Sequence, residues 1–119
     1  MSEMNERPGS RVEALLDLIE MRRPAVDAIA FLGSLPWDAP EELVELRRTH
    51  VLTAIARCLD GSLSPEELRF WAESIEGRED IGHESGEVDL REVLFELATP
   101  ELFGDPVANA SELLERLGN

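Results

Sequence analysis

Hydrophobic residues recur at every third or fourth position along most of the chain, which is the spacing of helices buried on one face. The first such segment begins near Ser10, where Ser10 and Glu13 have the spacing of a capping box. Its apolar positions are Val12, Leu15, Leu16 and Ile19. Pro24 interrupts this pattern and predicts a second, shorter helix before the loop that starts at Gly33.

The centre of the chain predicts two helices separated by a tight turn. Residues 41–59 form the longest periodic segment, and the Asp60-Gly61 pair has the composition of a helix end. The stretch Ser64-Pro65-Glu66-Glu67 predicts the next helix start. Serine caps a helix, proline suits its first position, and a glutamate three residues after the cap can bond back to the cap backbone. Gly77 ends this second helix.

The C-terminal part predicts a loop over 78–87 and helices over 88–98 and 109–117. No pair of alternating segments is joined by a hairpin turn, so strands are not expected. We therefore predict an all-α fold, an antiparallel bundle of about five to six helices. Residues 1–9 are expected to form a flexible N-terminal tail, and residues 10–119 a single helical domain.

Composition narrows the classes of partner. The chain has 119 residues and a formal net charge of -15, from 26 acidic residues against 11 arginines. This charge argues against direct nucleic-acid binding and against docking on anionic membranes, because both surfaces are negatively charged. No segment has the hydrophobic run of a signal peptide or a membrane span, and the single cysteine excludes an internal disulfide. We expect a cytoplasmic protein.

The acidic residues are unevenly distributed. Between Glu73 and Asp89 there are seven acidic residues and one arginine, a net charge of -6 in 17 residues. Self-repulsion in such a segment costs stability, and a basic partner would offset it. A solvated acidic loop is the other interpretation.

Aromatic residues near this segment suggest a contact surface. Trp71 falls on the buried face of its helix, and Phe70 points about 100° away from it. Trp37 lies in a proline-rich loop. An exposed Trp or Phe beside acids can anchor a protein partner, although a Trp packed under a helix is the more common outcome.

The sequence contains no arrangement typical of catalysis. His50 lies inside the predicted long helix, and Cys58 lies two turns further on, about 12 Å away, which is too far for a direct Cys–His pair. We interpret both as structural residues and expect no catalytic residue, metal or cofactor. The loop that contains His83 and Glu84 is a weak candidate for a cation site.

One stretch carries a resemblance to a known family. It runs from Val51-Leu52 through Leu63-Ser64-Pro65-Glu66-Glu67-Leu68 to Trp71-Ala72, a helix, an Asp-Gly turn and a serine-capped helix. This layout resembles the opening of small helical bacterial immunity proteins of the colicin D type. The resemblance implies an acidic helical bundle that binds and occludes a secreted nuclease toxin.

These observations predict a non-enzymatic, immunity- or antitoxin-like domain that docks an acidic surface onto a basic protein partner. The resemblance implies that this partner is a nuclease toxin. The residues expected to contact the partner are Glu76, Glu79, Asp80, Glu84, Glu87, Phe70 and Trp71. The alternative is a structural helical module that forms a homodimer through exposed apolar faces of the first and last helices.

Overall fold

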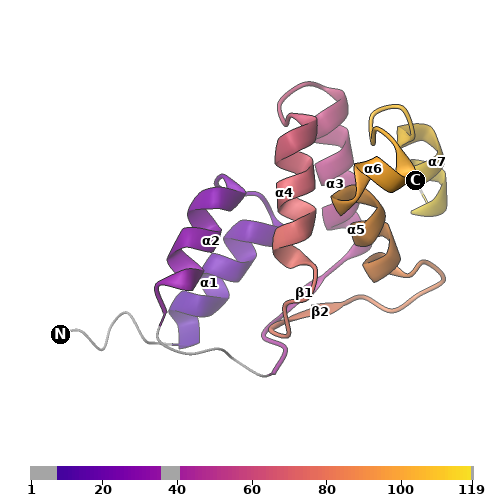
Figure 1. The fold of residues 1–119 in the computed structure, drawn as a ribbon. Helices are drawn as coiled ribbons and strands as arrows, with labels where there is room; N and C mark the ends of the chain where they lie inside the picture. Colours follow the sequence, from indigo (N-terminus) through magenta and orange to yellow (C-terminus); the bar gives the residue numbers. More distant parts are fainter. Residues whose placement is uncertain (1–7, 36–40, 119) are drawn as a thin grey trace.

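The computed structural model describes residues 8–35 and 41–118, and most of these residues are helical (Figure 1). Along the chain the elements are α1 (Pro8–Ile19), α2 (Ala25–Gly33), β1 (Val44–Leu46), α3 (Arg48–Leu59), α4 (Pro65–Ile75), β2 (Ile81–His83), α5 (Leu90–Ala98), α6 (Pro100–Phe103) and α7 (Ala110–Arg116). The predicted helical class is confirmed, but a purely α-helical fold is wrong because the chain also forms a small sheet.

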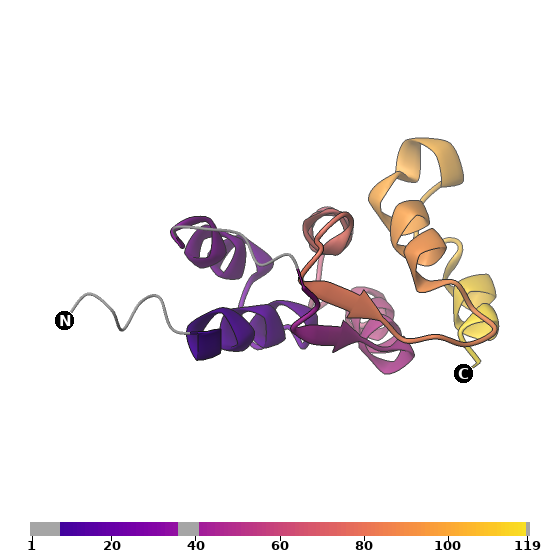
Figure 2. The same ribbon diagram turned by 90° about the horizontal axis from the view of Figure 1, so that it is seen from below.

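The sheet consists of β1 and β2, which run parallel with Val44 opposite Ile81 and Leu46 opposite His83. The two strands lie side by side across the underside of the molecule (Figure 2). Residues 41–47 are therefore not part of the long helix that periodicity predicts, and 78–87 is not wholly a loop. Three-residue strands are too short to show a reliable alternation, and their pairing joins segments far apart in sequence.

The helices α3 and α4 connect the two strands, which gives the crossover that parallel pairing requires. Their predicted turn is confirmed: Asp60 is the C-cap of α3, and Gly61 has a φ of 86°. The predicted capping box of α4 is also confirmed, since the Glu67 backbone N–H donates to Ser64 Oγ at 3.1 Å and the Ser64 N–H donates to Glu67 Oε1 at 2.8 Å. These local signals place α4 correctly.

The N-terminal helix differs from its prediction in two ways. It begins at Pro8, so Ser10 lies within α1 rather than capping it, and residues 1–7 of the expected tail lie outside the described residues. Its buried apolar positions are Ala14, Leu15, Leu18 and Ile19, and Arg11 is buried as well. The buried face is rotated from the predicted one because α1 packs against α2 and also against β1 and α4.

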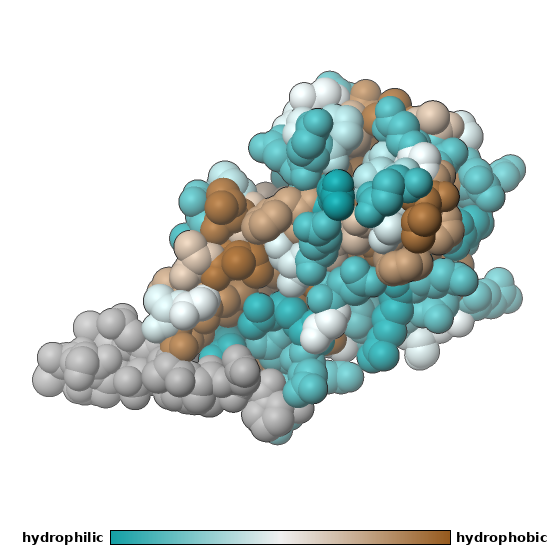
Figure 3. Space-filling model, viewed as in Figure 1, coloured by the Kyte–Doolittle hydropathy of each residue, from teal (hydrophilic) through white to brown (hydrophobic). Residues whose placement is uncertain are grey.

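The dimer hypothesis expects exposed apolar faces on the first and last helices, but the described residues of α1 and α7 include no exposed large hydrophobic side chain. Among the described residues, the exposed large hydrophobic side chains are Val26, Leu59, Phe70, Phe95, Leu102, Phe103 and Val107. Figure 3 shows hydrophobic surface over α2 and a second area near α5 and α6, with polar surface between them. Within residues 8–35 and 41–118, no helix is both long and apolar enough to cross a bilayer.

Candidate functional site

Asp80 is a buried structural residue rather than an exposed acid. Arg11 Nη1 lies 3.3 Å from Asp80 Oδ2, and Arg78 donates from Nε and Nη2 to the two carboxylate oxygens, each at 2.9 Å. Only 4% of the Asp80 side chain is exposed. A carboxylate can be buried when cations and hydrogen bonds replace its hydration. The structure therefore places Asp80, which the sequence analysis expects at the partner surface, in the interior between two arginines.

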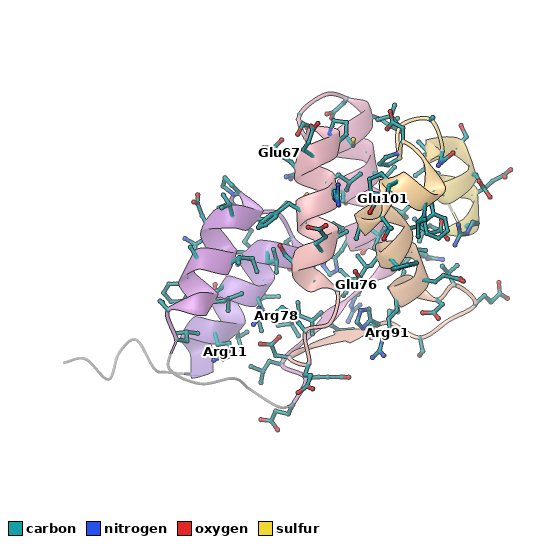
Figure 4. The ribbon with its side chains drawn as sticks, in the orientation of Figure 1. Arg11, Glu67, Glu76, Arg78, Arg91 and Glu101 are labelled. Atoms are coloured by element: carbon teal, nitrogen blue, oxygen red, sulfur yellow. The ribbon has the colours of Figure 1, made fainter. Side chains whose placement is uncertain are left out.

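This ion cluster joins α1 to the start of the sheet. The backbone oxygen of Asp80 accepts a hydrogen bond from the Leu43 N–H at 2.9 Å, just before β1 begins. Figure 4 shows Arg11 on α1 and Arg78 on the segment after α4 pointing into the same region. The cluster therefore fixes the backbone next to Glu79, whose own side chain is exposed.

Trp71 is likewise part of the core. Its side chain is almost fully buried, with 1% of the residue exposed, and Nε1 donates to the Leu18 carbonyl oxygen at 2.8 Å. This bond satisfies the indole N–H and attaches α4 to the end of α1. The structure confirms that Trp71 occupies the buried face of α4, and it places this predicted contact residue in the core rather than on the surface.

Phe70, in contrast, is 37% exposed. It borders an apolar groove of about 450 Å³ between the start of α2, the turn after α3 and α4. Val26 and Leu63 also line this groove, and Arg23 and Glu66 lie at its edges. Phe70 therefore remains available for a contact. Trp37 lies outside the described residues.

A second pocket lies where the exposed acids of the predicted surface gather. It has a volume of about 440 Å³ and is bounded by the end of α4, the start of the sheet and the first turn of α5. We call it the acidic pocket; its lining residues are Glu42, Glu76, Gly77, Arg78, Glu79, Ile81, His83, Arg91 and Leu94. Figure 4 shows Glu76 and Arg91 at neighbouring ends of α4 and α5.

The acidic pocket contains more carboxylates than its own cations neutralise. Within the described part of the chain, Glu42, Glu76 and Glu79 form no ion pair. Arg78 is already bound to Asp80. Arg91 is thus the one lining cation that Asp80 does not engage, which leaves an excess of negative charge facing solvent.

His83 brings an unusual polar group into this pocket. Both of its ring nitrogens are buried and have no hydrogen-bond partner among the described residues. Burial lowers the pKa of His83, and the positive charge of Arg91 lowers it further, against the opposing effects of Asp89 and Glu42. The imidazole is therefore neutral near pH 7, with one nitrogen able to accept and the other able to donate a hydrogen bond.

Sequence reasoning missed Glu42, because it lies in a segment predicted to be helical and far from the acidic loop. In the structure its carboxylate lies over β2, where a Cβ added to Gly82 would come within 2.7 Å of Glu42 Cδ. Glycine at position 82 therefore leaves room for this carboxylate. The parallel register brings Glu42 and Glu79 to the same end of the sheet, and no local pattern reveals that register.

The two remaining predicted acids lie apart from the acidic pocket. Glu84 Oε1 accepts the Arg48 N–H at 2.7 Å, so its carboxylate satisfies a backbone donor at the start of α3. Glu87 is exposed in the following loop, and both residues border a smaller pocket of about 250 Å³. The predicted set is thus divided: Glu76 and Glu79 share the acidic pocket, Glu87 is exposed beside a different pocket, and Glu84 has a structural bond.

His50 and Cys58 have structural environments. His50 Nδ1 accepts the Arg47 N–H at 2.8 Å, and burial lowers the pKa of the imidazole. Burial raises the pKa of the Cys58 thiol, with a smaller effect from Asp105, so the unreactive thiol form dominates at neutral pH. Across the residues that the structure describes, no group of three or more His, Cys, Asp or Glu side chains could hold a metal ion.

The arrangement is therefore a pocket lined by three glutamates, next to a buried cluster of Arg11, Asp80 and Arg78. Comparison with known proteins adds no relative from which a function could be transferred: no family model, no curated protein and no solved structure matches this chain.

Proposed function

We propose that this protein is a non-enzymatic binding domain that docks an acidic face onto a basic protein partner. The acidic face consists of Glu42, Glu76, Glu79 and Glu87. The observation that carries the proposal is that three of these carboxylates line one pocket without an ion pair among the described residues. Grouped, unpaired carboxylates raise the local negative potential, and a basic partner would relieve their repulsion.

The charge of the whole chain supports the same class of partner. A net charge of -15 repels nucleic acid and anionic lipid, and it accelerates encounter with a positively charged protein. The buried Arg11–Asp80–Arg78 cluster holds one side of the acidic face in place before any partner arrives. A preformed surface loses less conformational entropy on binding than a flexible loop does.

An immunity or antitoxin role is the specific form of this proposal. The active site of a nuclease is built to receive phosphate, so a preformed acidic surface is complementary to it. The resemblance of residues 51–72 to colicin D-type immunity proteins agrees with this role. The proposed partner is then a nuclease toxin, and the proposed place of action is the cytoplasm.

The test is an affinity capture with variants matched in charge. The wild-type chain and two triple variants are immobilised, exposed to a lysate of the source organism at low salt and eluted with a salt gradient. One variant carries Glu76→Gln, Glu79→Gln and Glu87→Gln on the acidic face. The control carries Asp27→Asn, Glu112→Gln and Glu115→Gln, which also removes three negative charges.

We expect one basic protein to be retained by the wild type and by the control, and to be lost or to elute at lower salt from the acidic-face variant. The reason is that local complementarity, rather than total charge, determines the contact. An equal effect of the two triple variants on retention would contradict the proposal, because the contact would then not depend on the acidic face in particular.

Self-association is the second candidate, and one observation favours it. Phe95 and Phe103 pack edge to face with centroids 5.6 Å apart, yet each is 42% exposed, and Leu102 beside them is 70% exposed. A homodimer would bury this surface on α5 and α6. Sedimentation at micromolar concentration in high salt tests it. A dimer that Leu102→Asp dissociates would support self-association, and a monomer would exclude it.

A further inference from the structure

We propose that His83 makes the end of β2 sensitive to acid: protonation of its imidazole releases β2 from β1 and opens one wall of the acidic pocket. This inference rests on the proposed function, since it concerns the regulation of the acidic face. It gives the small sheet a second role, because the pocket then forms only while the two strands stay paired.

The imidazole of His83 lies where it cannot take up a proton without a structural change. The residue as a whole is half-buried, but both ring nitrogens are buried, and neither has a hydrogen-bond partner among the described residues. Leu46, its partner in the strand register, is fully buried, and Leu94 of α5 lines the same pocket. A protonated imidazole in this place would be a buried charge without a hydrogen-bond acceptor, which is far more costly than the neutral ring.

The nearest charged groups do not compensate for this burial. Arg91, in the first turn of α5, lines the same pocket and opposes a second positive charge. Burial, and after it the charge of Arg91, lowers the pKa of His83 from its ordinary value of 6.5, and the opposing effects of Asp89 and Glu42 do not restore it. The closed sheet therefore holds the neutral imidazole.

Other charged groups on the neighbouring segments are exposed or already engaged. They are Glu45, Glu76, Arg78, Glu79 and Glu84. Glu84 accepts the Arg48 N–H at 2.7 Å. Arg78 is bound to Asp80. The two glutamates at the pocket rim are exposed, and the glutamate of β1 lies opposite Gly82 rather than His83. Among these described groups, none accepts a hydrogen bond from the imidazole.

The two ends of β2 are held to different degrees. At its start, the Asp80 backbone oxygen accepts the Leu43 N–H, and two arginines bind the Asp80 carboxylate. At its end, the Glu84 N–H donates to the Leu46 carbonyl oxygen at 2.8 Å, and the chain then enters a long loop (Figure 2). A short strand beside a loop can open locally at a lower free energy than the whole chain unfolds. Opening therefore begins at the His83 end.

Opening at this end removes part of the acidic pocket. β2 supplies Ile81 and His83 to the pocket wall, and the Glu42 carboxylate lies over Gly82. When β2 leaves β1, the carboxylates of Glu42 and Glu79 are no longer held at one end of the sheet. The acidic face is therefore intact where an exposed imidazole is neutral, and it is lost progressively as the pH falls below about 6.5.

The test is amide hydrogen exchange of the full chain, measured by NMR between about pH 5.5 and 7.5 and corrected for the intrinsic effect of pH. We expect the opening constant of the Glu84 N–H to rise about tenfold from the higher to the lower pH, because only the open state takes up the proton. The Leu43 N–H, next to the Asp80 cluster, should respond much less. Low urea concentrations should accelerate exchange at Ile75 in α4 but not at Glu84, since the opening at Glu84 is local.

Two variants and one direct measurement complete the test. His83→Phe keeps a ring and removes the titration, so opening at Glu84 should no longer depend on pH. His50→Gln removes the only other histidine and should leave the rise in place. The pKa of His83, followed through its imidazole carbon resonances in the wild type, should lie below 6.5 and needs no substitution.

Several results would overturn the inference. These are a rise at Glu84 that persists in His83→Phe, a rise of equal size at Leu43, equal urea dependence at Glu84 and Ile75, and a His83 pKa of 6.5 or above. Capture of the basic protein at both pH values tests the link to binding. Retention by the wild type should fall at the lower pH, and retention by His83→Phe should fall less. An equal fall in both would contradict control of the acidic face by His83.

Failure of this inference is distinguishable from failure of the proposed function. If exchange at Glu84 does not respond to pH, but the acidic-face variant still loses the captured basic protein, the proposed function stands and the acid-sensitive sheet is wrong. If Glu84 opens in acid but capture does not depend on the acidic face, the acid-sensitive sheet stands and the proposed function fails.

Discussion

Glu79 and Asp80 are neighbouring carboxylates that the fold uses in opposite ways. Asp80 is buried between Arg11 and Arg78, whereas Glu79 is exposed at a pocket and has no ion pair among the described residues. Phe70 and Trp71 show the same contrast for aromatic side chains, since one borders a groove and the other lies in the core. The charge or aromatic character of a residue in the sequence therefore does not show whether it is buried in the fold or exposed and available to a partner.

The largest expected effect is the loss of folding stability when the buried carboxylate of Asp80 is removed. Asp80→Ala removes the carboxylate that two arginines share and should lower the free energy of unfolding by about 3–5 kcal/mol. Glu79→Ala should change it by less than about 0.5 kcal/mol. Urea denaturation of both variants measures the difference. Similar losses of stability in the two variants would contradict the difference in role between the buried Asp80 and the exposed Glu79.

Variants of Trp71 and Phe70 should differ less in their free energy of unfolding than those of Asp80 and Glu79. Trp71→Phe removes buried volume and leaves the Leu18 carbonyl without its indole donor, so it should cost about 2–3 kcal/mol. Phe70→Ala should cost less than about 1 kcal/mol, because this ring is already partly in solvent. The same denaturation experiment applies. A cost for Phe70→Ala as large as that for Trp71→Phe would mean that Phe70 belongs to the core.

Two serines, one at a helix start and one in a loop, offer a sharper comparison. Ser64→Ala should cost about 1 kcal/mol, since it removes a hydrogen bond to the Glu67 N–H. Ser85→Ala should cost less than about 0.5 kcal/mol, because Ser85 is exposed in the loop after β2. Thermal unfolding followed by circular dichroism compares the two. A loss at Ser85 equal to that at Ser64 would mean that the cap of α4 adds no stability of its own.

The smallest effect is a dependence of stability on pH. Burial lowers the pKa of His83 and His50 from the ordinary value of 6.5. As pH falls below that value, the unfolded chain takes up more protons than the folded chain, so stability present at neutral pH is progressively lost. Unfolding in urea between about pH 5.5 and 7.5 measures this slope. His83→Gln should reduce it and leave the part that His50 contributes; an unchanged slope would show that His83 titrates alike in both states.

Local signals explain which parts of the fold were predictable. The Ser64-to-Glu67 box and the Asp60-Gly61 turn act within a few residues, and the structure confirms both. The sheet was missed because β1 depends on pairing with residues 81–83, across two helices. The start of α1 was misplaced because Ser10 and Glu13 satisfy the spacing without occupying a helix end.

The candidate site was predictable only in part for the same reason. The acidic segment indicated Glu76 and Glu79, which do meet at a pocket. Local charge could not show that Asp80 has two arginine partners, one of them 69 positions earlier in the chain. Nor could it show that Glu42 joins the pocket, since this depends on the register of the two strands.

The route of the chain between β1 and β2 has a consequence for how the protein matures. Glu42 and Glu79 lie at the start of two segments that meet only after α3 and α4 have folded back. Such long-range pairing costs loop-closure entropy. An incompletely synthesised or partly unfolded chain therefore cannot present the pocket, and a bound partner would in turn hold the two ends of the crossover together.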